Sequence, residues 1–262
     1  PFTGPSSSSL KRSDQHIAFH MSEINTLQDL DRLWEALIQG QEQPICFTGL
    51  QGASRMLVLA QFQKTAPLPL LIITSTPSDA EKVFKDFIFF FQDTKEAQND
   101  IPVPCLFPQW EVLPYDDKTP HPEIVKERLS VLSRLLRGDR LMVVTTIRAV
   151  LQRILPRGVL QRGSLDIHAG DVLDPDAFMN KICRSGYRRA DLVEMPGTFS
   201  RRGGILDIFP PNQTFPFRIE FFGDEIESIR IFSPEDQRSF NTVPRIQTIL
   251  SREILLDPSA LD

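Results

Sequence analysis

A loop between an expected strand and an expected helix holds the residues that could bind a phosphate. It runs from Gly49 to Met56 and contains a second glycine, Gly52. A phosphate-binding loop has the pattern G-x-x-x-x-G-K-[ST], so Gly49 fills its first position and Ser54, Arg55 and Met56 fill its last three. The spacing is therefore that of a nucleotide-binding loop, altered at each of the last three positions.

Each of these three substitutions weakens phosphate chemistry. Ser54 stands where a glycine lets backbone N–H groups wrap a phosphate. Arg55 keeps the positive charge, but its planar fork is not the compact ammonium group of a lysine. Met56 lacks the hydroxyl that would hold Mg²⁺. The loop is either a divergent nucleotide site or a strand–loop–helix unit kept for packing, and we favour the second interpretation.

A second set of residues with chemical potential lies on a strand of alternating pattern. Residues 217–222 read Phe-Arg-Ile-Glu-Phe-Phe, so one face would carry apolar side chains and the other Arg218, Glu220 and Phe222. An exposed Phe beside an Arg and a Glu is typical of a protein–protein contact. The alternatives are a solvated Arg218–Glu220 pair and a register slip that would place Phe222 in the core.

Residues for catalysis or metal binding are not grouped in the sequence. The four histidines are scattered, and His168 is expected in a loop. The three cysteines have no zinc-type spacing, and we expect Cys46 and Cys105 to be buried free thiols in a reducing cytoplasm. Asp207 lies between apolar residues and is expected to hydrogen-bond to the backbone. No catalytic residue and no metal site is therefore predicted.

Length and composition fit a two-domain chain. Its 262 residues are 41% hydrophobic, and its net charge of −5 is not that of a basic nucleic-acid platform. The apolar run at residues 88–91 is too short to span a membrane. Residues 1–22 begin with a polar, turn-forming stretch without an initial Met, so we expect a disordered start and a fragment of a longer protein.

The first half of the chain predicts strands that alternate with helices. The expected strands are 45–48, 70–74, 103–107 and 141–145. The expected helices are 27–39 (capped by Thr26), 57–62, 78–91 (capped by Ser78), 123–137 and 147–155. This alternation predicts an α/β domain over residues 23–156, with a P-loop-like parallel sheet and helices on both faces.

The second half predicts a smaller α+β domain over residues 157–243. Asp174 and Pro175 are a typical helix start, and that helix should run to about residue 184. From Arg188 onward the sequence consists of short strands and turns, which indicates an antiparallel sheet. The segment 244–262 contains one more possible strand.

The stretch from 202 to 239 is specific enough for a comparison with known families. It contains R-G-G-I-L-D-I-F-P, then F-R-I-E-F-F-G-D-E-I-E-S-I-R, then Q-R-S. These motifs resemble the second domain of the transcription-repair coupling factors (Mfd) and, more loosely, domain 2 of the excision-repair protein UvrB. F-P-x-W-E-x-L-P-Y-D at residues 107–116 also resembles Mfd and leaves no room for the tyrosine-rich hairpin by which UvrB clamps DNA.

The altered loop at residues 49–56 separates the two families. UvrB carries an intact P-loop, whereas the first domain of Mfd resembles UvrB but has a degenerate one. The resemblance is therefore to the N-terminal UvrB-homology region of Mfd. In this architecture the second domain is an insertion, so residues 244–262 would return towards the first domain.

The resemblance implies a non-catalytic recognition module that binds UvrA. The family's contact positions fall on Arg202, Arg218 and Phe222, with Arg201 and Glu220 beside them. We expect the side chains of Arg202 and Arg218 to be exposed. Glu220 would order the guanidinium of Arg218 or pair with a basic group of the partner.

The resemblance also implies a role for the longer parent protein. Such a protein would recruit UvrA to a stalled RNA polymerase by mimicking UvrB, and a C-terminal domain would mask the UvrA surface. RNA polymerase, DNA, ATP and Mg²⁺ would be bound by other parts of the parent, so no cofactor and no membrane contact are expected here. The alternatives are a divergent UvrB-type DNA-dependent ATPase and a DNA-binding module.

Overall fold

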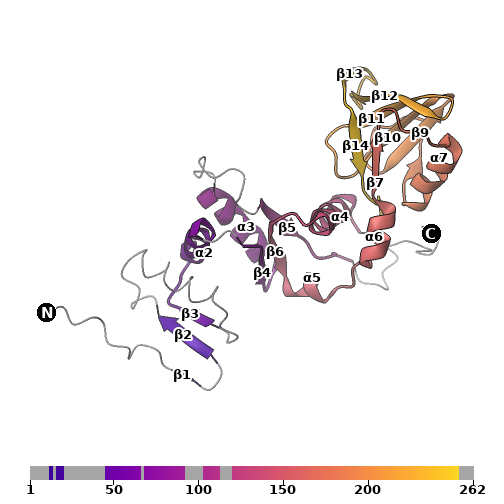
Figure 1. Ribbon diagram of the computed structural model, residues 1–262. Helices are drawn as coiled ribbons and strands as arrows, with labels where there is room; N and C mark the ends of the chain where they lie inside the picture. The colour runs from indigo at the N-terminus through magenta and orange to yellow at the C-terminus, as the bar shows by residue number, and fades with distance from the viewer. Residues whose placement is uncertain are drawn as a thin grey trace. The chain divides into compact units, whose positions relative to one another are not determined.

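The chain folds into two compact units, which Figure 1 shows in a computed structural model. The first comprises residues 1–105 and 140–144, and the second comprises residues 106–139 and 145–262. The second unit contains the helix expected at 123–137 and the chain from 145 onward. The structure describes residues 12–13, 16–20, 45–65, 68–91, 103–112 and 120–253.

Two three-stranded sheets occur in the first part of the chain. One has the order β1 (Arg12–Ser13), β2 (His16–His20), β3 (Ile45–Thr48), with β2 and β3 parallel. The other has the order β4 (Leu70–Thr74), β6 (Leu141–Thr146), β5 (Val103–Phe107).

The prediction of a single sheet was therefore wrong for residues 45–48. β3 pairs with β2, which lies in the stretch that we expected to be disordered. Cys46 on β3 is exposed rather than buried, because this small sheet is separate from the one that carries the core, whereas Cys105 on β5 is buried as expected.

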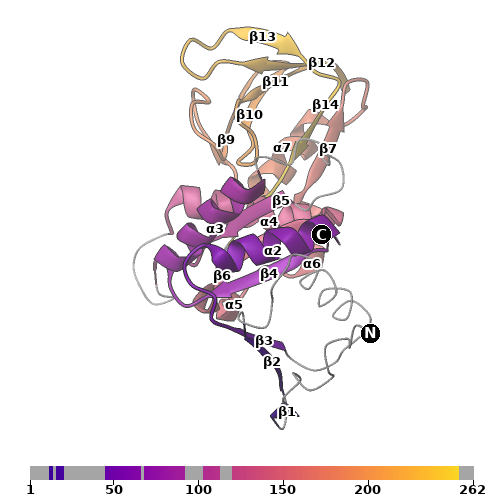
Figure 2. The ribbon, with the colours of Figure 1, turned by 90° about the vertical axis from the view of Figure 1, so that its left-hand side faces the viewer.

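Helices α2 (Ser54–Thr65) and α3 (Pro77–Phe91) pack on one face of the β4-β6-β5 sheet (Figure 2). α3 starts after Thr76, whose hydroxyl accepts the backbone N–H of Asp79 at 3.1 Å, and not after Ser78. Thr76 and Ser75 in turn donate to the Asp79 carboxylate, which lowers its pKa. The core between helices and sheet consists of Met56, Phe87 and Met142, with Leu59, Leu70, Ile72, Val83 and Phe90 packed against it. The helix expected at 27–39 lies outside the described residues.

The helices of the second unit begin and end at well-defined caps. α4 (Pro122–Arg137) starts at His121, whose Nδ1 accepts the backbone N–H of Glu123, and ends at Gly138 with a φ of 83°. The helix expected over 147–155 is shorter than predicted, since α5 (Ile147–Leu151) ends at the extended residue Gln152. A second short helix, α6 (Arg157–Gly163), follows Pro156, which occupies its N-cap position.

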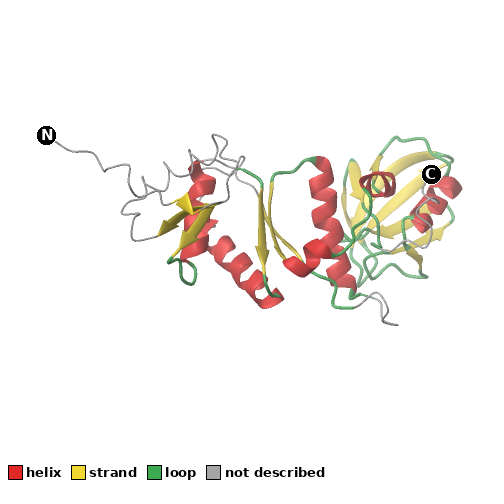
Figure 3. Cartoon of the chain, turned by 90° about the horizontal axis from the view of Figure 1, so that it is seen from below, coloured by secondary structure: helices red, strands yellow, loops and turns green. Residues whose placement is uncertain are grey.

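Strands dominate the remainder of the second unit (Figure 3). A six-stranded sheet has the order β13 (Ser239–Thr242), β12 (Glu225–Phe232), β11 (Phe217–Phe222), β10 (Ile205–Phe209), β9 (Thr198–Arg202), β8 (Arg188–Arg189). All neighbours are antiparallel except β8 and β9. The predicted antiparallel sheet is confirmed.

Two further elements complete this β-rich part. α7 (Pro175–Arg184) begins after its cap Asp174, as predicted, and packs Phe178 and Ile182 on one face of the six-stranded sheet. β7 (Leu165–His168) pairs antiparallel with β14 (Arg245–Thr248). His168 therefore ends a strand instead of lying in a loop, and the segment after 243 pairs with the start of the same β-rich part.

A buried ion pair joins three distant segments of the second unit. Arg128 on α4 donates to both carboxylate oxygens of Glu253 at 2.7 Å, and both side chains are almost fully buried. Trp110 donates its Nε1–H to the same carboxylate at 3.0 Å, and Arg128 also donates to the carbonyl of Pro108. The proline-rich segment that begins at Phe107 is thus fixed to α4 and to the C-terminal segment.

We expect Glu253→Ala to lower the free energy of unfolding by about 3–5 kcal/mol, because it leaves the Arg128 guanidinium buried without an anion. Urea denaturation followed by circular dichroism measures this change. The neighbouring exposed residue provides the control, since Arg252→Ala removes a side chain outside this network. Equal midpoints for the wild type and Glu253→Ala would contradict the assignment.

Candidate partner-binding site

Two tight hairpins set the register of the strands that carry the predicted contact residues. Gly203, between β9 and β10, has a φ of 61°, and Gly223, between β11 and β12, has a φ of 64°, values that favour glycine. A Cβ on Gly204 would lie 2.9 Å from the carbonyl oxygen of Phe221, so only glycine fits there without a shift. The backbone conformation therefore requires the two glycines of the R-G-G motif, whether or not a partner binds.

The alternation predicted for β11 is confirmed. Phe217 and Ile219 are buried in the core beneath α7, and Phe221 packs against that core. Phe222 is 79% exposed, which excludes the alternative that it belongs to the core. The opposite face of the sheet, which we call the open face, carries Arg218 and Glu220 of β11.

Asp207 of β10 organises the open face. Its side chain is 1% exposed, and it lies directly opposite Arg218 in the register of β10 and β11. The Nε and Nη2 of Arg218 donate to its two oxygens at 2.8 and 3.0 Å. Nη2 of Arg202 donates to one of the same oxygens at 3.0 Å. One buried carboxylate thus fixes both arginines that the sequence singled out.

The two arginines differ in exposure. The side chain of Arg202 is 54% exposed, as expected, but that of Arg218 is only 18% exposed. Arg218 also donates to the backbone carbonyl of Gln237 and stacks its guanidinium 4.8 Å from the centre of the Phe232 ring. Its hydrogen bonds to Asp207 raise its pKa. The expectation that Arg218 is freely exposed was therefore wrong, because Asp207 and the turn before β13 enclose it.

Glu220 has different partners from those expected. It accepts a hydrogen bond from Ser228 at 2.7 Å and pairs with Arg230 at 3.0 Å, both on the neighbouring strand β12. Arg230 lies directly opposite Arg218 in the register. Arg218 of β11 turns to Asp207 on β10, and Arg230 of β12 turns to Glu220 on β11, so each arginine has a carboxylate partner on the neighbouring strand. The predicted pairing of Glu220 with Arg218 is replaced by an alternating set of three cations and two anions.

Arg201 does not join this group. Its register partner Leu206 belongs to the core beneath α7, and its guanidinium pairs with Asp176 at the start of that helix. Successive residues of a strand point to opposite faces, so Arg201 lies on the helix-covered face and Arg202 on the open face. The structure places Arg202, Arg218 and Glu220 on the open face, with Phe222 exposed at the end of β11, and leaves Arg201 apart from them.

Asp207 is the residue whose role sequence reasoning missed. The expectation that its side chain hydrogen-bonds to the backbone was wrong. The signal was present in I-L-D-I-F, because alternation places Leu206 and Ile208 in the core and Asp207 on the open face. Its pairing with Arg218 depends on the register between β10 and β11, and a local sequence pattern does not predict that register.

The altered loop at residues 49–56 runs into the first turn of α2, which begins at Ser54. Gly49 and Gly52 have φ values of 82° and 56°, and the hydroxyl of Ser54 donates to the carbonyl of Gln51 at 2.6 Å. Arg55 is exposed, whereas Met56 is 5% exposed and belongs to the core of α2, α3 and the sheet. The position of a magnesium-binding hydroxyl is thus occupied by a packing side chain. Among the described residues, no group of three or more His, Cys, Asp or Glu could hold a metal ion.

Comparison with known families identifies the class of domain to which this sheet belongs. Residues 165–253 match the model of the UvrB interaction domain, which covers β7 to β14 and the last residues of the described chain. The family match therefore contains the whole open face, including Arg202, Asp207 and Arg218.

Relatives of the chain are transcription-repair-coupling factors. The chain is 36% identical over 211 residues to that of Myxococcus xanthus, which is 79% of this chain and 17% of the relative. It is 30% identical over 235 residues to that of Bacillus subtilis, which is 90% of this chain and 19% of the relative. The Escherichia coli protein is 35% identical over 153 residues, 58% of this chain and 13% of the relative. The chain is homologous to these factors over most of its length and spans less than one fifth of theirs, which confirms the resemblance.

Removing Arg218 should destabilise the fold more than removing Arg202. Arg218→Ala leaves the buried Asp207 carboxylate with one partner, and we expect it to lower the free energy of unfolding by about 3 kcal/mol. Arg202→Ala removes an exposed partner and should cost about 1 kcal/mol or less. Urea denaturation of both variants tests this difference.

The double variant Asp207→Ala/Arg218→Ala provides the control. It removes the buried charge together with its main partner and should unfold at higher urea than Arg218→Ala alone. Equal midpoints for the Arg202→Ala and Arg218→Ala variants would show that Asp207 does not depend on Arg218.

Proposed function

We propose that the open face binds UvrA, and that the chain serves as the recognition module of a transcription-repair coupling protein. The observation that carries the proposal is the pair Arg202 and Arg218 held by Asp207, with Phe222 exposed on the same face. The family name of the domain and the transcription-repair-coupling relatives support it. This surface would recruit UvrA by mimicking the surface with which UvrB binds UvrA.

The geometry suits recognition because its cations are fixed in advance. Asp207 holds two guanidinium groups, so little side-chain entropy is lost when a partner binds them. Arg202 keeps more than half of its side chain exposed and can offer its remaining N–H groups to a partner carboxylate. Phe222, which is exposed at the end of β11, would supply an aromatic anchor on the same strand face.

No catalytic role is proposed for this part of the parent protein. Met56 packs in the core where a P-loop would offer a hydroxyl to Mg²⁺, and the Ser54 hydroxyl donates to the carbonyl of Gln51. These contacts count against the divergent ATPase. The net charge of −5 counts against a DNA-binding module. We assign three further roles to other parts of the parent protein: ATP-driven movement on DNA, binding of RNA polymerase, and masking of the UvrA surface by a C-terminal domain. The parent protein would act in the cytoplasm.

The described residues contain no helix that is both long enough and apolar enough to cross a lipid bilayer.

Phe222→Ala should weaken binding to UvrA by about 2 kcal/mol or more, because an exposed aromatic anchor would lose its contact. Arg202→Ala should weaken it too. Calorimetric titration of purified UvrA with this chain measures both effects. Arg201→Ala is the matched control, since it removes the same kind of side chain from the adjacent residue on the opposite face.

The variants separate a contact role from a folding role. Phe222 and Arg202 are exposed, so their variants should keep the wild-type circular dichroism and should lose no more than about 1 kcal/mol of the free energy of unfolding. Equal losses of affinity for Arg201→Ala and Arg202→Ala would place the contact elsewhere. Absence of binding by folded wild-type chain would overturn the proposed function.

We also expect no saturable binding of ATP to this chain in the presence of Mg²⁺. At its last three positions the altered loop lacks the glycine, the lysine and the Mg²⁺-binding hydroxyl side chain of a P-loop. Calorimetry at millimolar ATP tests this prediction. Saturable heat that Arg55→Ala abolishes would restore the divergent ATPase as the better interpretation.

A further inference from the structure

A pocket in the second unit lies outside the open face. Its volume is about 490 Å³, and its walls come from the Trp110 segment, the start of α4, the 195–197 loop and residues 251–253. This volume falls in the range of pockets that hold ligands, about 300–1,000 Å³. None of the residues that line it takes part in the proposed UvrA contact.

The lining is apolar with a basic edge. Trp110, Val125, Met195 and four prolines supply the apolar part. The acidic side chains at the pocket are already paired, since Glu253 binds Arg128 and Glu123 lies 3.6 Å from Lys126. Arg188 and Arg252 are exposed and form no ion pair within the described part of the chain. Two guanidinium groups thus remain for an external anion.

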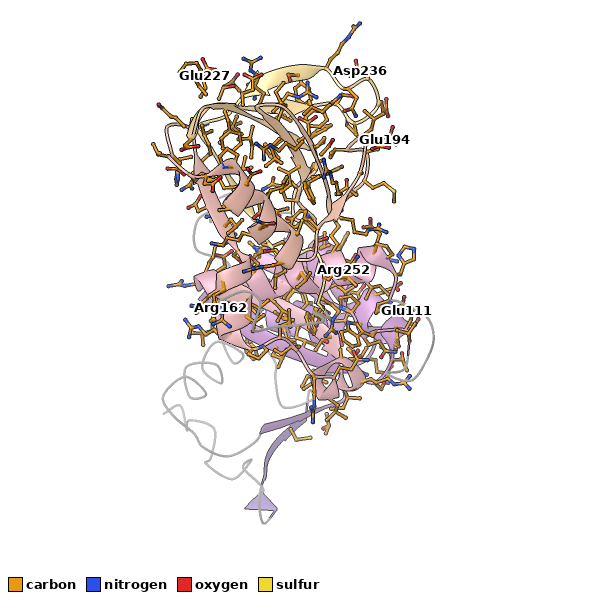
Figure 4. All side chains as sticks on the ribbon, turned by 90° about the vertical axis from the view of Figure 1, so that its right-hand side faces the viewer. Glu111, Arg162, Glu194, Glu227, Asp236 and Arg252 are labelled. Atoms are coloured by element: carbon orange, nitrogen blue, oxygen red, sulfur yellow. The ribbon has the colours of Figure 1, made fainter. Side chains whose placement is uncertain are left out.

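The walls are held by contacts that do not require a ligand. The Trp110 ring is fixed through its Nε1–H to Glu253, and its backbone N–H donates to Gln152 at 2.9 Å. A Cβ on Gly197 would lie 2.2 Å from the Ser251 hydroxyl, so this wall is closely packed. The pocket is therefore largely preformed, which reduces the entropy lost on binding. Figure 4 shows the Arg252 side chain between the strands and the helices of this unit.

We propose that this pocket binds an acidic peptide segment of a protein partner, with a bulky apolar side chain against Trp110 and Met195 and carboxylates against Arg188 and Arg252. Charge complementarity argues for an anionic ligand, and the planar guanidinium favours carboxylates or phosphates. Nucleic acid fits less well, because two free cations neutralise few phosphates and the walls are proline, valine and methionine. The inference does not depend on the proposed UvrA contact.

The test uses the full chain with Trp34→Phe, which leaves Trp110 as the single tryptophan. The probe is a blocked tetrapeptide, Asp-Leu-Leu-Asp, titrated while Trp110 emission is recorded. We expect a saturable change in emission. The control peptides Lys-Leu-Leu-Lys and Asp-Ser-Ser-Asp should bind at least about tenfold more weakly, because they lack the anions and the apolar side chains, respectively.

Charge reversal locates the binding site. The double variant Arg188→Glu/Arg252→Glu should bind the acidic peptide about tenfold more weakly or worse, and it should bind the lysine peptide in preference. Arg184→Glu/Arg189→Glu is the matched control, since both residues are exposed and neither lines the pocket. UvrA affinity should be unchanged in both variants, so that a failure of this proposal is distinguishable from a failure of the UvrA proposal.

Several outcomes would overturn the proposal. They are the absence of a saturable response to the acidic peptide, equal binding of the lysine peptide by the wild type, and unchanged binding after charge reversal at Arg188 and Arg252. A thymidine decamer that binds at moderate salt and displaces the peptide would assign the pocket to nucleic acid instead.

Discussion

A single buried carboxylate determines what the open face of the sheet can do. An ionised Asp207 in this position would be costly without partners, and the guanidinium groups of Arg218 and Arg202 offset that cost. The same hydrogen bonds remove the rotational freedom of two long side chains. A surface of otherwise mobile arginines becomes a fixed arrangement of donors, and the exposed ring of Phe222 lies on the same strand face as Arg218.

The second unit contains another buried carboxylate with a different role. Glu253 and Arg128 are both inaccessible, and their contacts join α4, the Trp110 segment and the C-terminal segment. No part of that pair faces solvent, so it positions chain segments and offers nothing to a partner. The pair at Asp207 leaves Arg202 more than half exposed. Exposure of one partner is therefore the physical difference between an ion pair that only stabilises and one that also presents a charge.

Local sequence patterns predicted the parts of this fold that depend on neighbouring residues. The cap at Asp174, the alternation along β11 and the limits of α4 follow from short-range preferences and were predicted closely. The pairing of β3 with β2, the partial burial of Arg218 and the role of Asp207 depend on residues distant in the sequence. The face of Arg201 was within reach, because strand alternation separates it from Arg202. The two arginines are adjacent in the motif, yet the pleat of the strand places them on opposite faces.

The loop before α2 and the open face point to the same division of function. Met56 has become part of a core, so a hydroxyl side chain at this position would place a polar group among Phe87 and Met142 and would lose packing. The packing of Met56 in the first unit therefore supports the proposal that this loop does not bind phosphate. The open face of the second unit, by contrast, keeps charged groups ordered at the surface where packing alone would not require them. Both features support the proposal that the chain serves as a module for recognition.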